Sequence, residues 1–539
     1  MQLGTRAVRS FTRWLAAFCL LPVCLLILGL TGASADEFRT PSISAVRVEW
    51  RAVLDQLRSE INTQPAIASA FTFASQRRVP RSDPRSMPAL VQLNAITSPI
   101  FAGIGRSPVP VLLPFDTASY LEARQSGVPE SVSVSRHQAD FRPADLFHAG
   151  GAGYDAMFAF EPGAGDGMPQ RTYARPVEVH ITGSILTYDL ADSLGGKGEP
   201  VKALAAQFPD MRRLIREGYV RYAFTRFGVP YVVSIQCLDS APRARRLACR
   251  EAYPVAERFL KALRVAGGQP SRPRRDISPE IAERPITPSP GFTYRPSGEI
   301  VTNSGARKQG GRVDVTAYSQ IRFPLEKAPA YARSQSFGRR NPNERGYPWQ
   351  DNFCEARSFE VGQCAAGFGH QGQDIRPGAC ALQNSESPGS CDPKQQAIVA
   401  VREGVLIRSL KQQAATLQVN TRNEHIRFRY MHMNPSSMDA DGILNGRQVA
   451  EGEKIGVASN YLDHPNGTSL HLHFDVQVFT RDGWIWVNPY TTLISAYERL
   501  LRGRGRELGT DPAAPAAVAH ALPREIIRPD TQEGSEGDN

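Results

Sequence analysis

The chain has 539 residues, of which 41% are hydrophobic and 22% are charged. This length allows two or three domains that each bury a core, and a composition with 45 glycines and 41 prolines predicts many loops but excludes a fibrous or wholly disordered protein. The formal net charge of +10 favours association with an anionic polymer such as a cell wall, but the basic residues are too dispersed to indicate nucleic-acid binding.

Residues 1–35 have the pattern of a secretory signal peptide. Arg6, Arg9 and Arg13 precede an uncharged apolar run at 14–30, and a small-residue cleavage motif follows at 33–35. The run has the minimum length of a membrane span, so an uncleaved anchor is the alternative. We therefore expect an exported protein, in the periplasm, at the cell wall or outside the cell. No stable membrane insertion is expected after the signal is cleaved.

Residues 36–266 have the pattern of an α+β domain. Hairpins are expected at 177–188 and 221–237, and a helix is expected after Pro254, with Gly267 as its C-cap. Residues 267–300 are rich in proline and arginine, which is typical of a linker. Strand patterns and glycine turns dominate residues 301–500, so this domain is expected to be mainly β. The composition of residues 501–539 predicts a disordered tail.

Six cysteines remain after the signal, and they lie in three near pairs. An even number of closely spaced cysteines in an exported chain indicates disulfides, and the low entropy cost of closing short loops favours local pairing. The expected disulfides are Cys237–Cys249, Cys354–Cys364 and Cys380–Cys391. A structural zinc site made of four cysteines is not expected, because no C-x-x-C pair occurs.

Two short motifs carry the candidate chemistry. His370 and Asp374 form an H-x-x-x-D motif, and His471 and His473 form an H-x-H motif. Apolar residues alternate with polar ones along 470–478, which predicts a strand with both imidazoles on its polar face. A histidine, an aspartate and a second histidine are ligands that zinc takes, and three protein ligands leave a position open for water. The remaining histidine is then a candidate general base or transition-state donor.

Five further stretches follow the patterns of one known family, in that family's order. They lie at 397–405 (V-x-A-x-x-x-G-x-V), 430–433 (Tyr-x-His-Leu), 445–456 (G-x-x-V-x-x-G-x-x-I-G), 467–474 (S-T-G-P-H-L-H-F) and 488–489 (a closing Asn-Pro). Together with the two motifs, they resemble the lysostaphin-type (LytM-type) zinc metallopeptidases, which cut peptide bridges of bacterial cell walls. The resemblance covers roughly residues 366–492. Leu470 stands where the family often has proline, and leucine is compatible with a strand.

The resemblance implies a mainly β domain whose antiparallel sheets form a groove with a zinc site, with its core at residues 366–495. It implies that one Zn²⁺ per chain is bound by His370, Asp374 and His473. His432 and His471 would be the catalytic pair, which activates a zinc-bound water or stabilises the oxyanion. The implied function is that of a zinc metalloendopeptidase hydrolysing peptide stems or cross-links of peptidoglycan. We also expect the two cystine loops beside the first motif to form walls of the substrate groove, with Tyr347, Trp349 and Phe353.

Two alternative functions stay open. Besides the peptidoglycan endopeptidase, the alternatives are a catalytically silent zinc domain that regulates another wall hydrolase and a zinc protease that acts on proteins. A serine hydrolase is disfavoured because no G-x-S-x-G motif occurs. Residues 36–266 either target the enzyme, occlude its groove or bind a partner, and the sequence leaves the oligomeric state open. Of the other histidines, His425 is expected at a surface turn and His464 in a solvated loop. His137, His148, His180 and His520 are taken as structural or surface residues.

Overall fold

The computed structural model describes residues 42–63, 88–125, 138–161, 176–190, 197–216, 218–237, 247–270, 285–298, 320–332, 348–355, 357–364, 367–377 and 397–508. The predicted signal peptide and the predicted disulfide Cys380–Cys391 lie outside these residues. The described residues, from Ser42 onward, belong to one compact unit. No helix among the described residues is long and apolar enough to cross a membrane.

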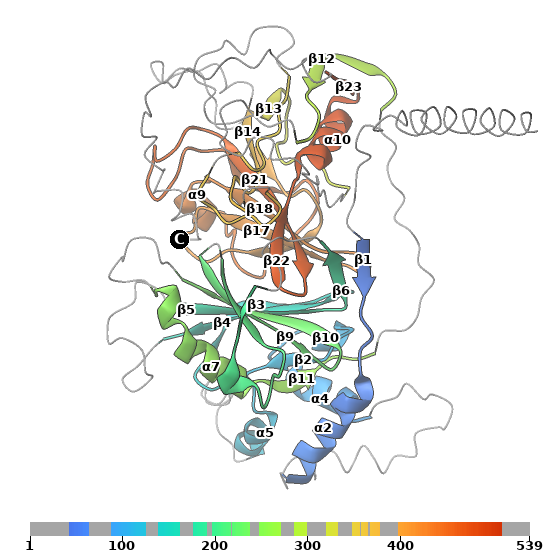
Figure 1. The fold of residues 1–539 in the computed structure, drawn as a ribbon, viewed down its shortest axis with the longest axis vertical. Helices are drawn as coiled ribbons and strands as arrows, with labels where there is room; N and C mark the ends of the chain where they lie inside the picture. The colour runs from blue at the N-terminus through green and yellow to red at the C-terminus, as the bar shows by residue number, and fades with distance from the viewer. Residues whose placement is uncertain are drawn as a thin grey trace, which may run out of the picture. The chain divides into compact units, whose positions relative to one another are not determined.

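The N-terminal half contains a seven-stranded antiparallel sheet in the order β3-β4-β5-β10-β9-β8-β7 (Figure 1). Its strands are β3 (Arg142–Ala149), β4 (Gly153–Phe160), β5 (Val177–Ser184), β7 (Glu199–Pro200), β8 (Arg212–Arg216), β9 (Tyr219–Arg226) and β10 (Val229–Gln236). Two further pairs join β1 (Ser42–Ala45) to β6 (Leu186–Asp189), and β2 (Val111–Leu113) to β11 (Arg264–Gly267).

Helices cover one face of this sheet. They are α2 (Trp50–Thr63), α4 (Pro88–Thr97), α5 (Thr117–Gln125) and α7 (Tyr253–Ala262), with short 3₁₀ turns at Ile104–Arg106, Lys202–Leu204 and Cys249–Glu251. Alternate residues of the strands, such as Tyr231 and Val233 of β10, pack into a common core with Phe259 of α7. The residues between them, such as Val232, point to the opposite face, which is also covered.

The hairpin expected at 221–237 is confirmed, and the one expected at 177–188 is wrong. Strands β9 and β10 pair around Phe227 and Gly228, which both have positive φ, as a tight two-residue turn requires. Strand β5 instead continues to Ser184 and pairs with β4 and β10, while β6 pairs with β1. The helix after Pro254 is confirmed as α7, although Gly267 ends strand β11 rather than capping the helix.

The C-terminal half is mainly β, as predicted. Its eight-stranded antiparallel sheet has the order β13-β14-β21-β18-β17-β16-β19, with β22 paired to β21. The strands are β13 (Ala330–Ala332), β14 (Gln373–Pro377), β16 (Gly404–Ile407), β17 (Ala415–Asn420), β18 (His425–Met431), β19 (Gln448–Val449), β21 (Leu472–Thr480) and β22 (Gly483–Val487). Strands β15 (Ala397–Val399) and β20 (Lys454–Val457) form a separate pair, and helices α9 (Pro435–Ala440) and α10 (Tyr490–Leu501) complete this half.

The structure places a strand in the segment predicted as a linker and another in the segment predicted as a disordered tail. Strand β12 (Pro288–Tyr294) lies within the segment expected to be a linker, and β23 (Arg504–Glu507) lies within the segment expected to be a disordered tail. The two strands pair in parallel. Aromatic packing explains the order, because Phe292 is buried against Trp349 and Tyr497. The division into two domains otherwise remains a prediction.

The two sheets are in direct contact through the face of the N-terminal sheet that carries no helices. Val232 packs with Phe479 and Trp484 of the β21–β22 hairpin. On the other side of the contact, Gly151 approaches the chain at Arg422 so closely that a Cβ atom would lie 2.5 Å from the Arg422 nitrogen. The N-terminal half is therefore packed against the C-terminal sheet along several strands.

A buried polar network lies within this contact and includes His425, which was expected at the surface. His425 is fully buried, and its Nε2 lies 2.8 Å from Oδ2 of Asp155 on β4. Asp155 also accepts hydrogen bonds from Arg427 (3.1 Å) and Thr182 (2.7 Å). Burial opposes ionisation of Asp155, but His425 and Arg427 outweigh it and lower the pKa of the carboxyl. The expected surface position is wrong because no local pattern indicates the partner sheet that covers the start of β18.

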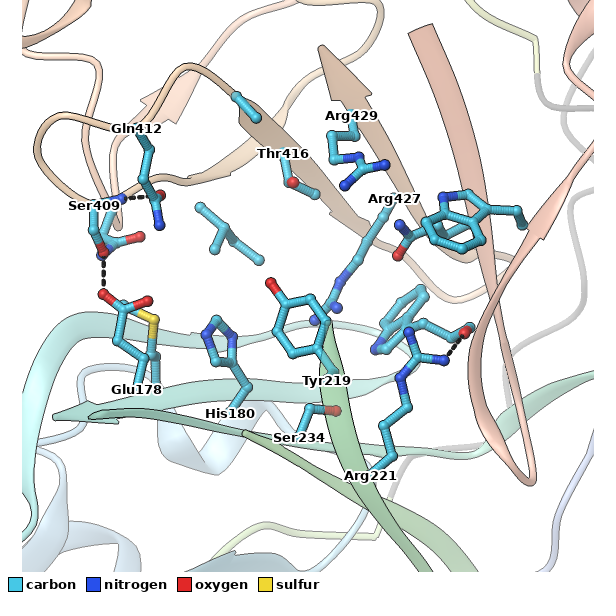
Figure 2. Close-up of a pocket in the computed structure, with 17 residues that line it drawn as sticks. Glu178, His180, Tyr219, Arg221, Ser234, Ser409, Gln412, Thr416, Arg427 and Arg429 are labelled. Carbon is cyan, nitrogen blue, oxygen red and sulfur yellow. Dashed lines mark hydrogen bonds between the residues drawn. The ribbon is translucent and has the colours of Figure 1, made fainter. Parts of the chain in front are cut away.

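A cavity of about 60 Å³ remains between the two sheets. Figure 2 shows Arg221, Arg427 and Arg429 directed into it from both halves, with His180 and Tyr219 on its N-terminal side. A space of this size accommodates a few water molecules. Charged side chains from both halves therefore line one small space within the contact.

Acidification is expected to destabilise the protein partly through His180. Burial and the nearby charge of Arg427 lower the pKa of His180 to about 3, below its ordinary value of 6.5. Between these two pH values the unfolded chain binds the extra proton, so stability falls as the pH falls, by at most about 1.4 kcal/mol per pH unit. From pH 7 to pH 5, the wild type should lose about 2 kcal/mol more than His180→Asn in urea unfolding. The exposed His464→Asn is the control, and equal losses in all three proteins would contradict the assignment.

Candidate metal centre

The candidate ligands come from two adjacent strands and the loop before them. Asp374 on β14 is paired directly with His473 on β21. His370 lies four residues before Asp374, in a loop that passes close to β21. Gly372 makes this approach possible, because a Cβ atom there would lie 2.4 Å from the carbonyl oxygen of Phe474. Strand pairing and this glycine together bring the two sequence motifs to one place.

One atom from each of these three residues points to a common centre. His370 Nε2 lies 2.9 Å from His473 Nδ1, and Asp374 Oδ1 lies 3.3 Å from each of the two nitrogens. All three side chains are buried. The opposite ring nitrogens face other groups, with His370 Nδ1 3.0 Å from the carbonyl oxygen of Asn352 and His473 Nε2 3.3 Å from Asp475 Oδ2.

These atoms fit a tetrahedral cation such as zinc. A tetrahedron with metal–ligand distances of about 2.0–2.1 Å has edges of roughly 3.3 Å, close to the separations observed. Asp374 Oδ2 is buried and has no hydrogen-bond partner among the described residues, a state that costs free energy unless a cation compensates it. Burial disfavours a charged His473, but Asp374 and Asp475 outweigh it and raise its pKa to about 10. The centre therefore stabilises positive charge.

His432 and His471 lie beside this group, with their ring centroids 4.5 Å apart. His471 Nε2 is 3.5 Å from Asp374 Oδ1. The Nδ1 atom of each ring lies against a backbone carbonyl oxygen, that of Ser469 for His471 (2.6 Å) and that of Tyr461 for His432 (3.1 Å). A carbonyl oxygen only accepts, so Nδ1 carries the proton in both neutral rings and Nε2 carries the lone pair.

The environment of His432 keeps its imidazole neutral. Burial, together with the charges of His471 and His473, lowers its pKa well below the ordinary value. Its backbone also has a positive φ of 66°, directly after the last residue of β18. This uncommon conformation at the end of a strand is a feature that clusters at functional sites.

The structure brings together all five residues that the sequence singled out for metal binding and catalysis. His464 is exposed in a loop, as expected. The predicted aromatic groove wall is wrong for Trp349 and Phe353, because both are buried, whereas Tyr347 lies outside the described residues. The disulfides Cys237–Cys249 and Cys354–Cys364 are present as predicted.

Sequence reasoning missed the groups that surround the candidate ligands. Asp475, Arg429 and the carbonyl of Asn352 all contact the site or its neighbours. Only Asp475 left a signal in the sequence, because it follows His473 by two residues and so lies on the same face of the strand. The others come from segments whose position depends on the tertiary fold.

Comparisons with known proteins are sparse. No protein-family model matches the chain, and no curated protein matches it significantly. A solved structure from Ruminococcus gnavus, described as a candidate glycyl-glycine endopeptidase lytM, is similar to part of the chain, at 16% identity and a TM-score of 0.20. The similarity covers 36% of this chain and 65% of that one, less than two thirds of its length. A likeness this distant says nothing about activity, which has to be argued from the site.

Proposed function

We propose that this chain is an exported zinc metalloendopeptidase of the lysostaphin type, which hydrolyses peptide stems or cross-links of bacterial peptidoglycan. The observation that carries the proposal is the convergence of His370, Asp374 and His473, with two further histidines beside them. The motifs between residues 366 and 492 support the family and the class of substrate. The two disulfides agree with an oxidising compartment outside the cytoplasm.

His370, Asp374 and His473 would hold one Zn²⁺ through Nε2, Oδ1 and Nδ1. A bound zinc ion supplies Lewis acidity, which polarises a peptide carbonyl and acidifies a water molecule. Asp374 is the single carboxylate among the three, so the occupied centre keeps a net positive charge. Burial strengthens the effect of that charge on a substrate carbonyl, because little water screens it.

His471 and His432 are the proposed acid–base pair. Because Nδ1 of each ring is protonated and lies against a carbonyl oxygen, Nε2 is the atom that accepts a proton from the attacking water. The proton is then returned to the nitrogen of the leaving amine, which completes hydrolysis of the peptide bond. The lowered pKa of His432 keeps that ring neutral, with Nδ1 donating to the carbonyl oxygen of Tyr461 and the lone pair on Nε2.

The proposal is tested by metal content and wall digestion, measured on the exported chain from residue 36 for wild type and His473→Ala. We expect close to one zinc per wild-type chain and release of peptidoglycan fragments with new peptide ends, with both lost in the variant. Zinc without cleavage of peptidoglycan would contradict the proposed substrate and favour a regulator or a protease of proteins. A wild-type chain that binds no zinc would overturn the proposal altogether.

A further inference from the structure

Asp475 stands behind the candidate ligand His473 on the same face of β21. Its Oδ2 lies 3.3 Å from His473 Nε2, on the side of the ring away from Asp374. Asp475 is fully buried, and His473 Nε2 has no well-aligned hydrogen-bond partner among the described residues. The carboxylate is therefore the acceptor that faces the outer nitrogen of this imidazole.

Two neighbouring strands hold this carboxylate in place. Arg429, which is paired with Asp475 across β18 and β21, donates from Nε to Oδ2 at 2.7 Å. Trp486 on β22 donates from Nε1 to Oδ1 at 3.1 Å. Arg429 also donates to the side chain of Gln371 (2.8 Å), the residue that follows His370. Asp475 is thus fixed from both sides, and one of its anchors reaches the loop that carries the first candidate ligand.

The contact has a direct chemical consequence for a metal ligand. An imidazole that binds a cation through Nδ1 must carry its proton on Nε2, and a buried N–H needs an acceptor. A carboxylate acceptor fixes the tautomer and the orientation of the ring, and it makes the other nitrogen a better electron donor. Removal of such a partner weakens metal binding about 10–100-fold in comparable sites.

We propose that Asp475 is a positioning residue, which holds His473 in the orientation and tautomer that bind the metal, and that Arg429 and Trp486 hold Asp475. The inference rests on the proposed zinc site and names residues that the motif pattern does not. Asp475 does not contact the reacting atoms in this scheme. Its effect passes through His473.

The test is the zinc affinity of Asp475→Asn in the exported chain, measured by competition with a chromophoric chelator. We expect binding about 10–100-fold weaker than in the wild type. Co²⁺ substituted for zinc should also show an altered visible absorption spectrum, because the geometry of the His473 ligand changes. Trp486→Phe keeps an aromatic ring but removes the Nε1 donor to Asp475, so it should also weaken zinc binding, by a smaller factor.

Asp155→Asn is the matched control. It removes a buried carboxylate that pairs with Arg427, two residues before Arg429 on the same strand, without touching a candidate ligand. Thermal unfolding of the metal-free proteins should show that both aspartate variants are destabilised, while only Asp475→Asn loses zinc affinity. Equal zinc affinity and an unchanged Co²⁺ spectrum in Asp475→Asn would overturn the inference and leave the proposed function intact. A wild type without zinc affinity would overturn both.

Discussion

Replacement of His471 by alanine is expected to slow peptide-bond hydrolysis by about two to four orders of magnitude while bound zinc stays close to the wild-type amount. The loss follows from the position of His471, whose Nε2 lies 3.5 Å from Asp374 Oδ1 and whose Nδ1 is committed to the carbonyl of Ser469. General acid–base catalysis contributes a factor of this size in many enzymes. The rate is measured as newly freed amino groups released from peptidoglycan per unit time, with zinc determined on the same sample.

His432→Ala provides the companion measurement. If the two histidines act as a unit, the double variant should be hardly slower than the slower single variant, because their effects are not additive. The exposed His464→Ala is the control and should retain both rate and zinc. Loss of zinc in His471→Ala, in proportion to the loss of activity, would make His471 a ligand rather than a member of the acid–base pair.

Replacement of Asp155 by alanine is expected to lower the free energy of unfolding by about 3–5 kcal/mol. Asp155 is the shared partner of His425 and Arg427 between the two sheets, and its side chain is 2% exposed. Without it, the charge of Arg427 stays buried and uncompensated, a loss that costs this much in buried ion pairs. The measurement is urea unfolding at neutral pH, followed by tryptophan fluorescence.

Glu199→Ala is the comparison for this prediction. Glu199 pairs with Arg213 at 2.6 Å, but its side chain is 72% exposed, and exposed pairs contribute about 1 kcal/mol or less. If the two variants lose the same stability, the Asp155 network does not hold the sheets together. Two separate unfolding transitions in the wild type would argue against the single compact unit.

The strand of the H-x-H motif illustrates what the sequence was able to predict. Leu472 and Phe474 are buried in the core of the C-terminal half, whereas His473 and Asp475 point to the other face, as the alternation predicts. Local patterns of this kind also predicted helix α7 and the hairpin of β9 and β10. The roles assigned to the metal and catalytic residues stay proposals, although their side chains meet as the motifs require.

The predictions that were wrong share a physical cause, because each depended on contact between segments that are distant in the chain. The sequence around His425 is typical of a surface turn, but Asp155 of the N-terminal sheet and Trp484 of β22 cover its side chain. Trp349 follows a glycine- and proline-rich stretch, yet it lies among Phe292, Phe323 and Tyr497 in the core. Strand β12 exists because β23 lies alongside it, more than 200 residues later. No local periodicity encodes such partners.

One face of the paired strands β18 and β21 carries both metal-site and interface residues, which matters for the design of truncated forms. Along that face, His473 belongs to the candidate metal centre, whereas Arg427 and the nearby Trp484 belong to the contact with the N-terminal sheet. A chain cut within residues 267–300 would release the C-terminal half with an exposed aromatic and cationic surface, which the N-terminal sheet covers in the intact chain. A cut after Tyr294 would also remove the partner of β23. Measurements on truncated forms would then reflect the exposed interface as well as the candidate metal centre.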